Sequence, residues 1–389
     1  MLAVLVQTLA PVGAGTTSIS RVSISSYGVE GNGTSARAAI SADGQFVAFW
    51  SRASNLVAAD NNGFADVFVR DLASETTARV SIATDGSEGN DDSYFAASSA
   101  DGRYIVFDSL ASNLINGDSN GFQVSDVFLR DRLTETTELV SVNSSGVQGD
   151  GASLHATINA DGRYVAFTSA ARNLVEGDTI NESDVFIRDR FAGSTRRVSI
   201  DSSGAQANRS SAGPSLGISG RYVAFWSLAS NLVASDTNGV ADVFVHDRVS
   251  ELTSRVSVST NGVEGNNESA YPAISGNGRY VAFWSSASNL VDGDSNNLSD
   301  IFVHDRVSGT TVAVSVNEGG DLGNDGSWER IDITDDGGKV AFWSYASNLA
   351  PADMNNAPDV FVRDLQMDST ELVSIDNLGL QGNNFSEMP

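Results

Sequence analysis

Val281-Ala282-Phe283-Trp284-Ser285 begins a phrase that this chain repeats six times. The phrase continues with Ala287-Ser288-Asn289-Leu290-Val291 and then with Asp300-Ile301-Phe302-Val303-His304-Asp305. Its first phenylalanine recurs every 58 to 60 residues, at Phe49, Phe107, Phe167, Phe225, Phe283 and Phe342. A period of this length indicates similar structural units, each of which buries its apolar surface against its neighbours.

Each unit is predicted to form four short antiparallel strands. In the clearest copy these strands cover 273–275, 279–284, 300–304 and 312–316, and Asn277-Gly278 supplies the tight turn between the first two. Valine, phenylalanine and threonine dominate the strands, and no helical period lasts ten residues. The sequence therefore predicts an all-β fold, a six-bladed β-propeller of four-stranded antiparallel blades. The alternative is an incomplete seven-bladed ring.

Both ends of the chain bear on that alternative. Residues 1–18 are interpreted as a degenerate repeat strand, because 3–9 overlay 66–72 without the aspartates. The other interpretation of this segment is the remnant of a secretory signal, since residues 1–10 are apolar and small residues follow. Arg21-Val22-Ser23-Ile24 is a seventh copy of the last strand, and 386–389 overlay the start of a first strand. We expect residues 19–389 to form a single propeller domain.

Composition excludes several classes of function. The chain has 49 acidic and 23 basic residues, a formal net charge of −26, which opposes binding to nucleic acid and to anionic membranes and favours cations or basic partners. Cysteine is absent, so disulfides and thiolate metal sites cannot form. No apolar run approaches the ~20 residues of a membrane helix, so we expect no membrane insertion. We expect a monomer.

The repeat also resembles a known family. The run Ser41-Ala42-Asp43-Gly44, the apolar residues 45–51 and the later Asp66-Val67-Phe68-Val69-Arg70-Asp71 are similar to the WD40-like, TolB-like propeller repeat of the PD40 type. The resemblance covers nearly the whole chain and implies a β-propeller. It implies less about function, because that family includes a periplasmic envelope protein as well as the propellers of serine peptidases.

In four units the long loop carries an acidic pattern, Asp-x-Asn-x-x-x-Asp, that suits a hard cation. The second unit stretches this pattern, and the third has Ile180 where the asparagine is expected. Calcium takes six to eight oxygen ligands, which carboxylates, an amide oxygen and backbone carbonyls of one loop can supply. The alternative is an ordinary turn in which Asp and Asn accept backbone hydrogen bonds. The candidate metal ligands are Asp60, Asn62, Asp66, Asp118, Asn120, Asp126, Asp178, Asp184, Asp236, Asn238, Asp242, Asp294, Asn296, Asp300, Asp353, Asn355 and Asp359.

Repetition argues against a catalytic site. A reaction centre needs one nucleophile or base in one environment, whereas most conspicuous polar residues here have equivalents in sister units. No His-Glu-x-x-His motif and no phosphate-binding loop is present. Asp108 and Thr168 replace the tryptophan that ends the second strand in the other four units, and His155 has no equivalent. Asp108 could serve a channel enzyme only with a partner that the sequence does not place, and His155 is interpreted as structural.

These observations together predict a non-enzymatic, calcium-binding β-propeller that serves as a protein or glycan interaction module. We expect it to be secreted, periplasmic or attached to the cell envelope of a bacterium, where millimolar calcium would fill weak repeated sites. Two alternatives stay open. One is a polysaccharide lyase or glycosidase that acts in the central channel, and the other is a structural spacer domain of a longer secreted protein.

Overall fold

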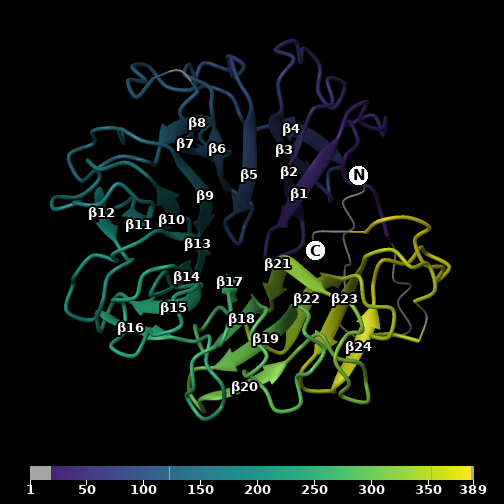
Figure 1. The fold of residues 1–389 in the computed structure, drawn as a ribbon. Helices are drawn as coiled ribbons and strands as arrows, with labels where there is room; N and C mark the ends of the chain where they lie inside the picture. Colours follow the sequence, from purple (N-terminus) through teal and green to yellow (C-terminus); the bar gives the residue numbers. More distant parts are fainter. Residues whose placement is uncertain (1–18, 122, 352, 387–389) are drawn as a thin grey trace. The chain divides into compact units, whose positions relative to one another are not determined.

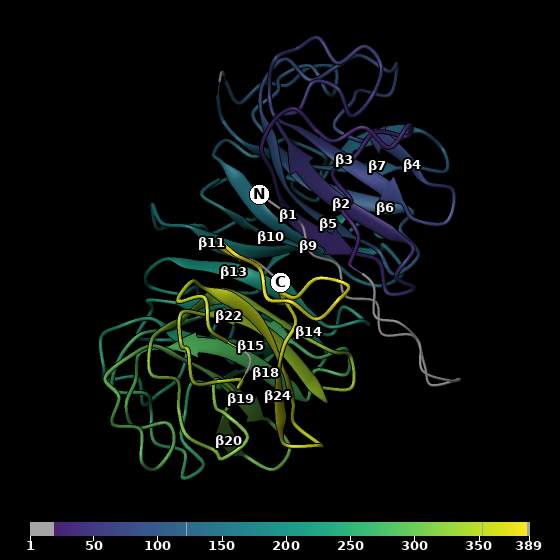
Figure 2. The same cartoon turned by 90° about the vertical axis from the view of Figure 1, so that its right-hand side faces the viewer.

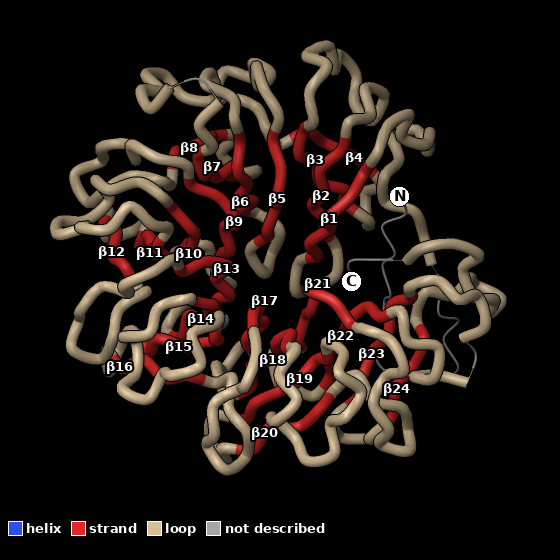
Figure 3. Tube along the Cα trace, viewed as in Figure 1, coloured by secondary structure: helices blue, strands red, loops and turns tan. Residues whose placement is uncertain are grey.

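The protein consists of four-stranded antiparallel sheets joined by turns and loops (Figures 1 and 3). The structure is a computed structural model and describes residues 19–121, 123–351 and 353–386. These residues form six sheets and no helix, and hence no helix that could span a membrane. The chain divides into two compact units, whose main segments are Arg21–Val198 and Ser199–Pro389, with three sheets each.

The first unit contains twelve strands. Its first sheet is β1 (Ser35–Ile40), β2 (Phe46–Ser51), β3 (Asp66–Asp71) and β4 (Thr76–Arg79). The second is β5 (Ser93–Ser98), β6 (Tyr104–Ser109), β7 (Asp126–Asp131) and β8 (Thr136–Leu139). The third is β9 (Ser153–Ile158), β10 (Tyr164–Ser169), β11 (Asp184–Asp189) and β12 (Ser194–Arg197). Strands of each sheet pair in chain order, as Figure 2 shows for β1, β2 and β3.

The second unit repeats this arrangement. Its sheets are β13 (Ser211–Leu216), β14 (Tyr222–Ser227), β15 (Asp242–Asp247) and β16 (Leu252–Arg255); β17 (Ser269–Ile274), β18 (Tyr280–Ser285), β19 (Asp300–Asp305) and β20 (Thr310–Ala313); and β21 (Ser327–Ile333), β22 (Lys339–Ser344), β23 (Asp359–Asp364) and β24 (Ser369–Leu372). The predicted fold class, an all-β six-bladed propeller, is confirmed by six such blades in the described residues.

The repeated phenylalanines form the core of each blade. Phe283 of β18 pairs with Phe302 of β19, and their ring centroids lie 6.0 Å apart. The other five sheets contain the same pair, and all twelve rings are fully buried. Burial of a phenylalanine side chain contributes roughly 1.5–3 kcal/mol relative to an exposed one, so these pairs are a major source of stability.

The fourth strand is shorter than predicted. It ends at Ala313, whereas the sequence suggested an end at 316. The reason is Ser315, whose hydroxyl accepts a hydrogen bond from the backbone N–H of Ile301 and donates one to Asp300, in place of a regular ladder bond. Val316 then forms an isolated bridge with Leu322. Seven such bridges occur among the described residues, and the first joins Ile24 to Glu30, so Ile24 matches Val316, just beyond the end of a fourth strand.

The first strand of each sheet contains a β-bulge. In β1 the register shifts between Ala36 and Ala39, so that Arg37 is an extra residue with a backbone φ of +56°. Non-glycine residues rarely adopt positive φ, and bulges commonly redirect a side chain at a functional site. Residues 1–18 lie outside the described residues, so their assignment stays a prediction. The single domain over 19–389 also stays a prediction.

Candidate functional site

The bulged positions are where the sister blades differ most. Five equivalent residues with positive φ occupy them, namely Arg37, Phe95, His155, Gly213 and Tyr271. Three of these, on β1, β5 and β9, belong to the first unit, where β5 contacts both other strands. The repeat therefore holds its backbone constant while it presents a different side chain from each first strand.

The three bulged side chains of the first unit touch one another. The guanidinium carbon of Arg37 lies 3.8 Å from the centroid of the Phe95 ring, a cation–π contact. The Phe95 ring also meets the ring of His155 edge-on, with centroids 4.6 Å apart and an interplanar angle of 71°. Phe95 thus holds a guanidinium on one side and an imidazole on the other.

A buried carboxylate lies beside this group. Asp108 of β6 occupies the position that tryptophan holds in four sister blades, and its side chain is 5% exposed. The backbone N–H of His155 donates a hydrogen bond to the Asp108 carboxylate. Its Oδ1 atom is buried and has no hydrogen-bond partner among the described residues. An unmade hydrogen bond of a buried polar atom costs about 1–3 kcal/mol, so this atom requires an explanation.

Burial changes the acidity of this carboxylate. Removal from water raises the pKa of Asp108 to about 8, although the His155 N–H and the charge of Arg37 both act in the opposite direction. At neutral pH the group is therefore mostly a neutral carboxylic acid, which can donate a hydrogen bond. We call the cluster of Arg37, Phe95, Asp108 and His155 the first-strand site.

The predicted metal ligands lie together in pairs, as the loop spacing implied. In the first loop, however, an arginine occupies the space between the carboxylates. Arg79 Nη1 lies 3.3 Å from Asp60 and 3.0 Å from Asp66, and Nη2 lies 2.6 Å from Glu88. The side chains of Arg79 and Asp60 are 9% and 4% exposed. The protein's own guanidinium thus neutralises the charges that we had assigned to calcium.

Arginine has the same place in the third and fourth loops. Arg197 contacts Asp178 at 3.0 Å and Asp184 at 3.1 Å. In the fourth loop Arg255 lies 3.2 Å from Asp242 and 2.6 Å from Glu264. Asp236, Asp242 and Glu264 there form a group of three carboxylates close enough to one another to hold a metal ion. Burial and the neighbouring Asp242 raise the pKa of Asp236 to about 6.

The second and sixth loops lack the arginine, because Leu139 and Leu372 end their fourth strands. A glutamine, at the position where the first and fourth loops have glutamate, contacts the carboxylates in its place. Gln148 Nε2 donates to Asp118 at 2.8 Å and to Asp126 at 2.7 Å. Gln381 makes the equivalent bonds to Asp353 and Asp359, both at 2.8 Å. An amide satisfies the carboxylate oxygens but leaves their charge, and burial raises the pKa of Asp126 to about 6.

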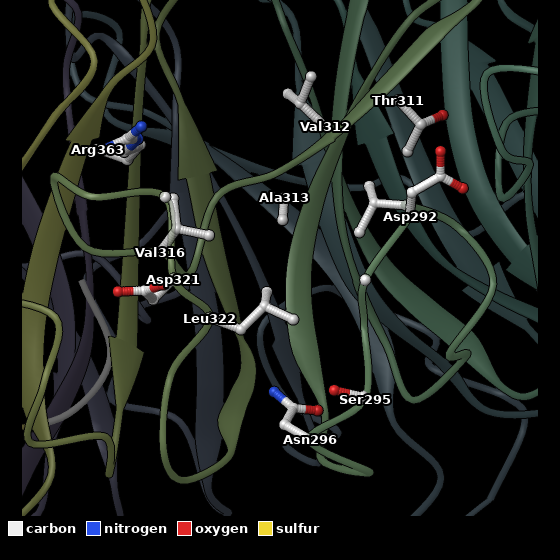
Figure 4. A pocket seen from close by; sticks show the side chains of 13 residues that line it. Asp292, Ser295, Asn296, Thr311, Val312, Ala313, Val316, Asp321, Leu322 and Arg363 are labelled. Carbon is white, nitrogen blue, oxygen red and sulfur yellow. The ribbon is translucent and has the colours of Figure 1, made fainter.

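The fifth loop has neither the arginine nor the glutamine that contacts the carboxylates in the other loops. Ala313 and Leu322 stand where the fourth loop has Arg255 and Glu264. A pocket of about 710 Å³ adjoins them, lined also by Asn296 (Figure 4). Burial raises the pKa of Asp300 to about 6, and Asp294 Oδ1 has no hydrogen-bond partner among the described residues.

The loop asparagines make turn contacts. Asn62 accepts a hydrogen bond from the N–H of Phe64 and donates one to Asp66. Asn238 and Asn296 do the same in their loops, which is the geometry of the alternative, an ordinary Asx turn. Calcium at these loops stays a prediction, and calorimetric titration of chelator-stripped protein tests it.

Sequence reasoning missed Arg37 and Phe95 and named Asp108 without a partner. The sequence does contain a signal for these residues, because the residue type at the bulged position differs from unit to unit while the residues around it repeat. It also missed the arginines between the loop carboxylates. Their signal was the arginine that ends the fourth strand in three units, Arg79, Arg197 and Arg255.

Comparison with known proteins shows the fold. No family model and no curated protein matches the chain. An oligogalacturonate lyase in complex with manganese matches with a TM-score of 0.54 and 11% identity, over 95% of this chain and 83% of that one. The β-propeller domain of the Trilobed protease from Pyrococcus furiosus matches with a TM-score of 0.54 and 10% identity, over 87% and 84%.

TolB from Acinetobacter baumannii is also among the matching structures. Its TM-score is 0.46 at 14% identity, and the match covers 79% of this chain and 58% of that one. The expected TolB-like propeller fold is supported by the six four-stranded blades of the described residues. Two further matches are prolyl endopeptidases and an acylaminoacyl peptidase.

These matches correct the predicted function. The sequence suggested a non-enzymatic calcium-binding interaction module, but the matching propellers include a lyase and several peptidases. The fold therefore does not separate enzymes from binding proteins. Location outside the cytoplasm and the kind of partner stay predictions. Function has to be argued from the site, because one propeller fold carries many activities.

Proposed function

We propose that this chain binds a small organic acid, a molecule with a carboxylate, at the first-strand site. The observation that carries the proposal is the buried Asp108 Oδ1 atom without a partner. A neutral carboxylic acid at this position can donate a hydrogen bond to a ligand carboxylate. A ligand of this kind would supply the partner that the described residues do not.

Charge supports a carboxylate over other ligands. Arg37 contributes a permanent positive charge next to Asp108, and guanidinium groups pair well with carboxylates. The stack on Phe95 holds Arg37 in one place, which reduces the entropy lost on binding. His155 is exposed and completes the polar surface. A cationic ligand would be opposed by Arg37.

The proposal is tested with matched pairs of sugars. Galacturonate and galactose share a ring and differ in the carboxylate, as gluconate and sorbitol do in open-chain form. We expect the acids, and not the neutral partners, to raise the unfolding temperature and to release heat in calorimetry. Arg37→Gln should weaken binding by roughly tenfold, since a charge-assisted hydrogen bond contributes about 1.5–3 kcal/mol.

Arg52→Gln is the matched control, because Arg52 belongs to the same unit but lies outside the site. Its binding should equal that of the wild type. Affinity should also fall as pH rises through about 8, where Asp108 ionises and repels the acid. Equal binding of acids and neutral sugars, or no effect of Arg37→Gln, would refute the proposal.

A further inference from the structure

A second pocket, which like the fifth-loop pocket lies in the second unit, includes two aromatic side chains. It has a volume of about 410 Å³ and is lined by Leu298, Ser299, Asp325, Gly326, Trp328 and Tyr345. Trp328 and Tyr345 are 45% and 40% exposed. One lining residue is acidic and none is basic. We call this the aromatic pocket.

Trp343 supports both exposed rings from behind. Its ring stacks on Trp328 with centroids 6.2 Å apart and an interplanar angle of 19°. It also contacts Tyr345 at 5.7 Å. The two pocket rings are therefore held in place before any ligand arrives, which lowers the entropic cost of binding.

Among the six described blades, one carries a tryptophan at this position of the first strand. Tryptophan at 328 replaces a residue that is elsewhere Ala36, Tyr94, Leu154, Ala212 or Ala270. Gly326 also contributes, because a Cβ atom there would lie 3.2 Å from Ser299 Oγ and 3.8 Å from Trp328 Nε1. The repeat therefore accounts for the backbone around the pocket, whereas the tryptophan at 328 is particular to this sheet.

The first unit shows what occupies the corresponding place between β2 and β5. There Arg52 donates hydrogen bonds to Asp92 at 2.9 Å and to the Tyr94 hydroxyl at 2.7 Å. Tyr94 corresponds to Trp328, and Arg52 corresponds to Ser286. The sister site therefore combines an aromatic ring, an acid and a cation of the protein's own. At the aromatic pocket the ring remains and the arginine is a serine. Gly326 stands where the first unit has Asp92, and the carboxylate comes from the residue before it, Asp325.

We propose that the aromatic pocket binds a small alkylated ammonium cation, such as a quaternary ammonium group. Aromatic faces attract such cations through their quadrupole, and the cation sheds little hydration because its charge is covered by methyl groups. Asp325 adds a negative charge at the rim, and the net charge of −26 favours cations over anions. The ligand takes the place that Arg52 fills in the sister site.

The test compares choline with its tert-butyl analogue, in which carbon replaces nitrogen and only the charge is lost. Both are titrated into the full chain, and binding is followed by tryptophan fluorescence and calorimetry. We expect saturable binding of choline and at least about tenfold weaker binding of the analogue. Trp328→Ala and Tyr345→Ala should each weaken choline binding by roughly tenfold, and Asp325→Asn by a smaller factor.

Two controls keep the test specific. Tyr27→Ala removes an aromatic ring that is 93% exposed and outside the pocket, so choline binding should not change. Asp108→Asn alters the first-strand site alone and should also leave it unchanged, so failure of one proposal is separate from failure of the other. Circular dichroism confirms that each variant is folded. Equal affinity for choline and its analogue, competition by glucose, or full binding by folded Trp328→Ala would overturn the proposal.

Discussion

Asp108 shows how one substitution within a repeat creates new chemistry. Tryptophan at the equivalent position packs between sheets, as Trp284 does when its Nε1 donates to Ser327 at 3.0 Å. Aspartate at this position is smaller and polar, yet it is buried, whereas the four tryptophans are only half-buried. The result is a carboxylic acid whose proton is retained at neutral pH. Such perturbed groups cluster at functional sites.

Asp108→Asn should change how stability depends on pH. The folded state raises the pKa of Asp108 to about 8, whereas the unfolded value is about 3.9, so the fold binds this proton more tightly. Wild-type stability is therefore lost as pH rises from about 4 to about 8, by an amount on the order of a few kcal/mol. Asparagine cannot ionise and still accepts the N–H of His155.

The measurement is the unfolding temperature of both proteins between pH 5 and 8. We expect the unfolding temperature of Asp108→Asn to increase relative to that of the wild type as pH rises. Glu135→Gln, at an exposed position in the same unit, is the control. The difference between its unfolding temperature and that of the wild type should stay constant over this pH range. A gap between Asp108→Asn and wild type that does not change with pH would show that Asp108 is ionised in the fold.

At the scale of elements, the tight turn after each first strand closes a hairpin and also packs against the preceding sheet. Gly278 has a φ of +73°, which glycine adopts without strain. A Cβ atom at this position would lie 2.1 Å from Cδ2 of Tyr222, in the preceding sheet. Gly102, Gly162 and Gly337 meet a ring of the preceding sheet in the same way. The turn therefore closes a hairpin and also forms part of the packing between sheets.

Gly278→Ala and Gly262→Ala separate these two roles. Gly262 has nearly the same φ, +76°, but no atom lies within 4 Å of its added Cβ. Gly262→Ala should cost about 1 kcal/mol of unfolding free energy, from backbone strain alone. Gly278→Ala should cost about 1–3 kcal/mol more, because the methyl group must displace Tyr222. Urea denaturation measures both, and equal losses would show that the ring contact imposes no constraint.

At the scale of the whole molecule, acidity opposes folding. The net charge of −26 produces self-repulsion in the compact state, which exposed ion pairs offset only weakly. Ion pairs between an arginine just before a second strand and an aspartate of the third strand reduce this repulsion locally. For example, Arg163 hydrogen-bonds Asp189 at 2.7 Å and lowers the pKa of that carboxyl to about 2. Such pairs lose their contribution as pH falls from about 4 through about 2.

Added salt should therefore stabilise the protein. Between 0.01 M and 0.15 M sodium chloride the screening length falls from about 30 Å to about 8 Å, which weakens repulsion between distant carboxylates. The unfolding temperature should rise over this range in chelator-treated samples. A fall would mean that the attractive pairs outweigh the repulsion. Sucrose at matched osmolality serves as the control for effects that do not depend on charge.

Much of the fold could be predicted from the sequence because its determinants are local and repeated. The apolar run within 279–284 and the Asn-Gly turn are visible within one unit, and the phenylalanines recur with the period of the units. The predicted ends of the fourth strands were less accurate, because a serine hydroxyl there accepts a backbone hydrogen bond in place of the neighbouring strand. The pairing of the loop aspartates was also predictable, since both lie in one loop.

The sequence by itself determined the all-β repeat, the number of strands in each unit and the buried phenylalanine pairs, because these follow from patterns within about 60 residues of chain. Only the tertiary structure decided which residues from different sheets meet. Arg37, Phe95, Asp108 and His155 come from separate strands, and bulges with positive φ turn three of them toward one another. Such contacts depend on packing between sheets, which leaves no local pattern in the chain.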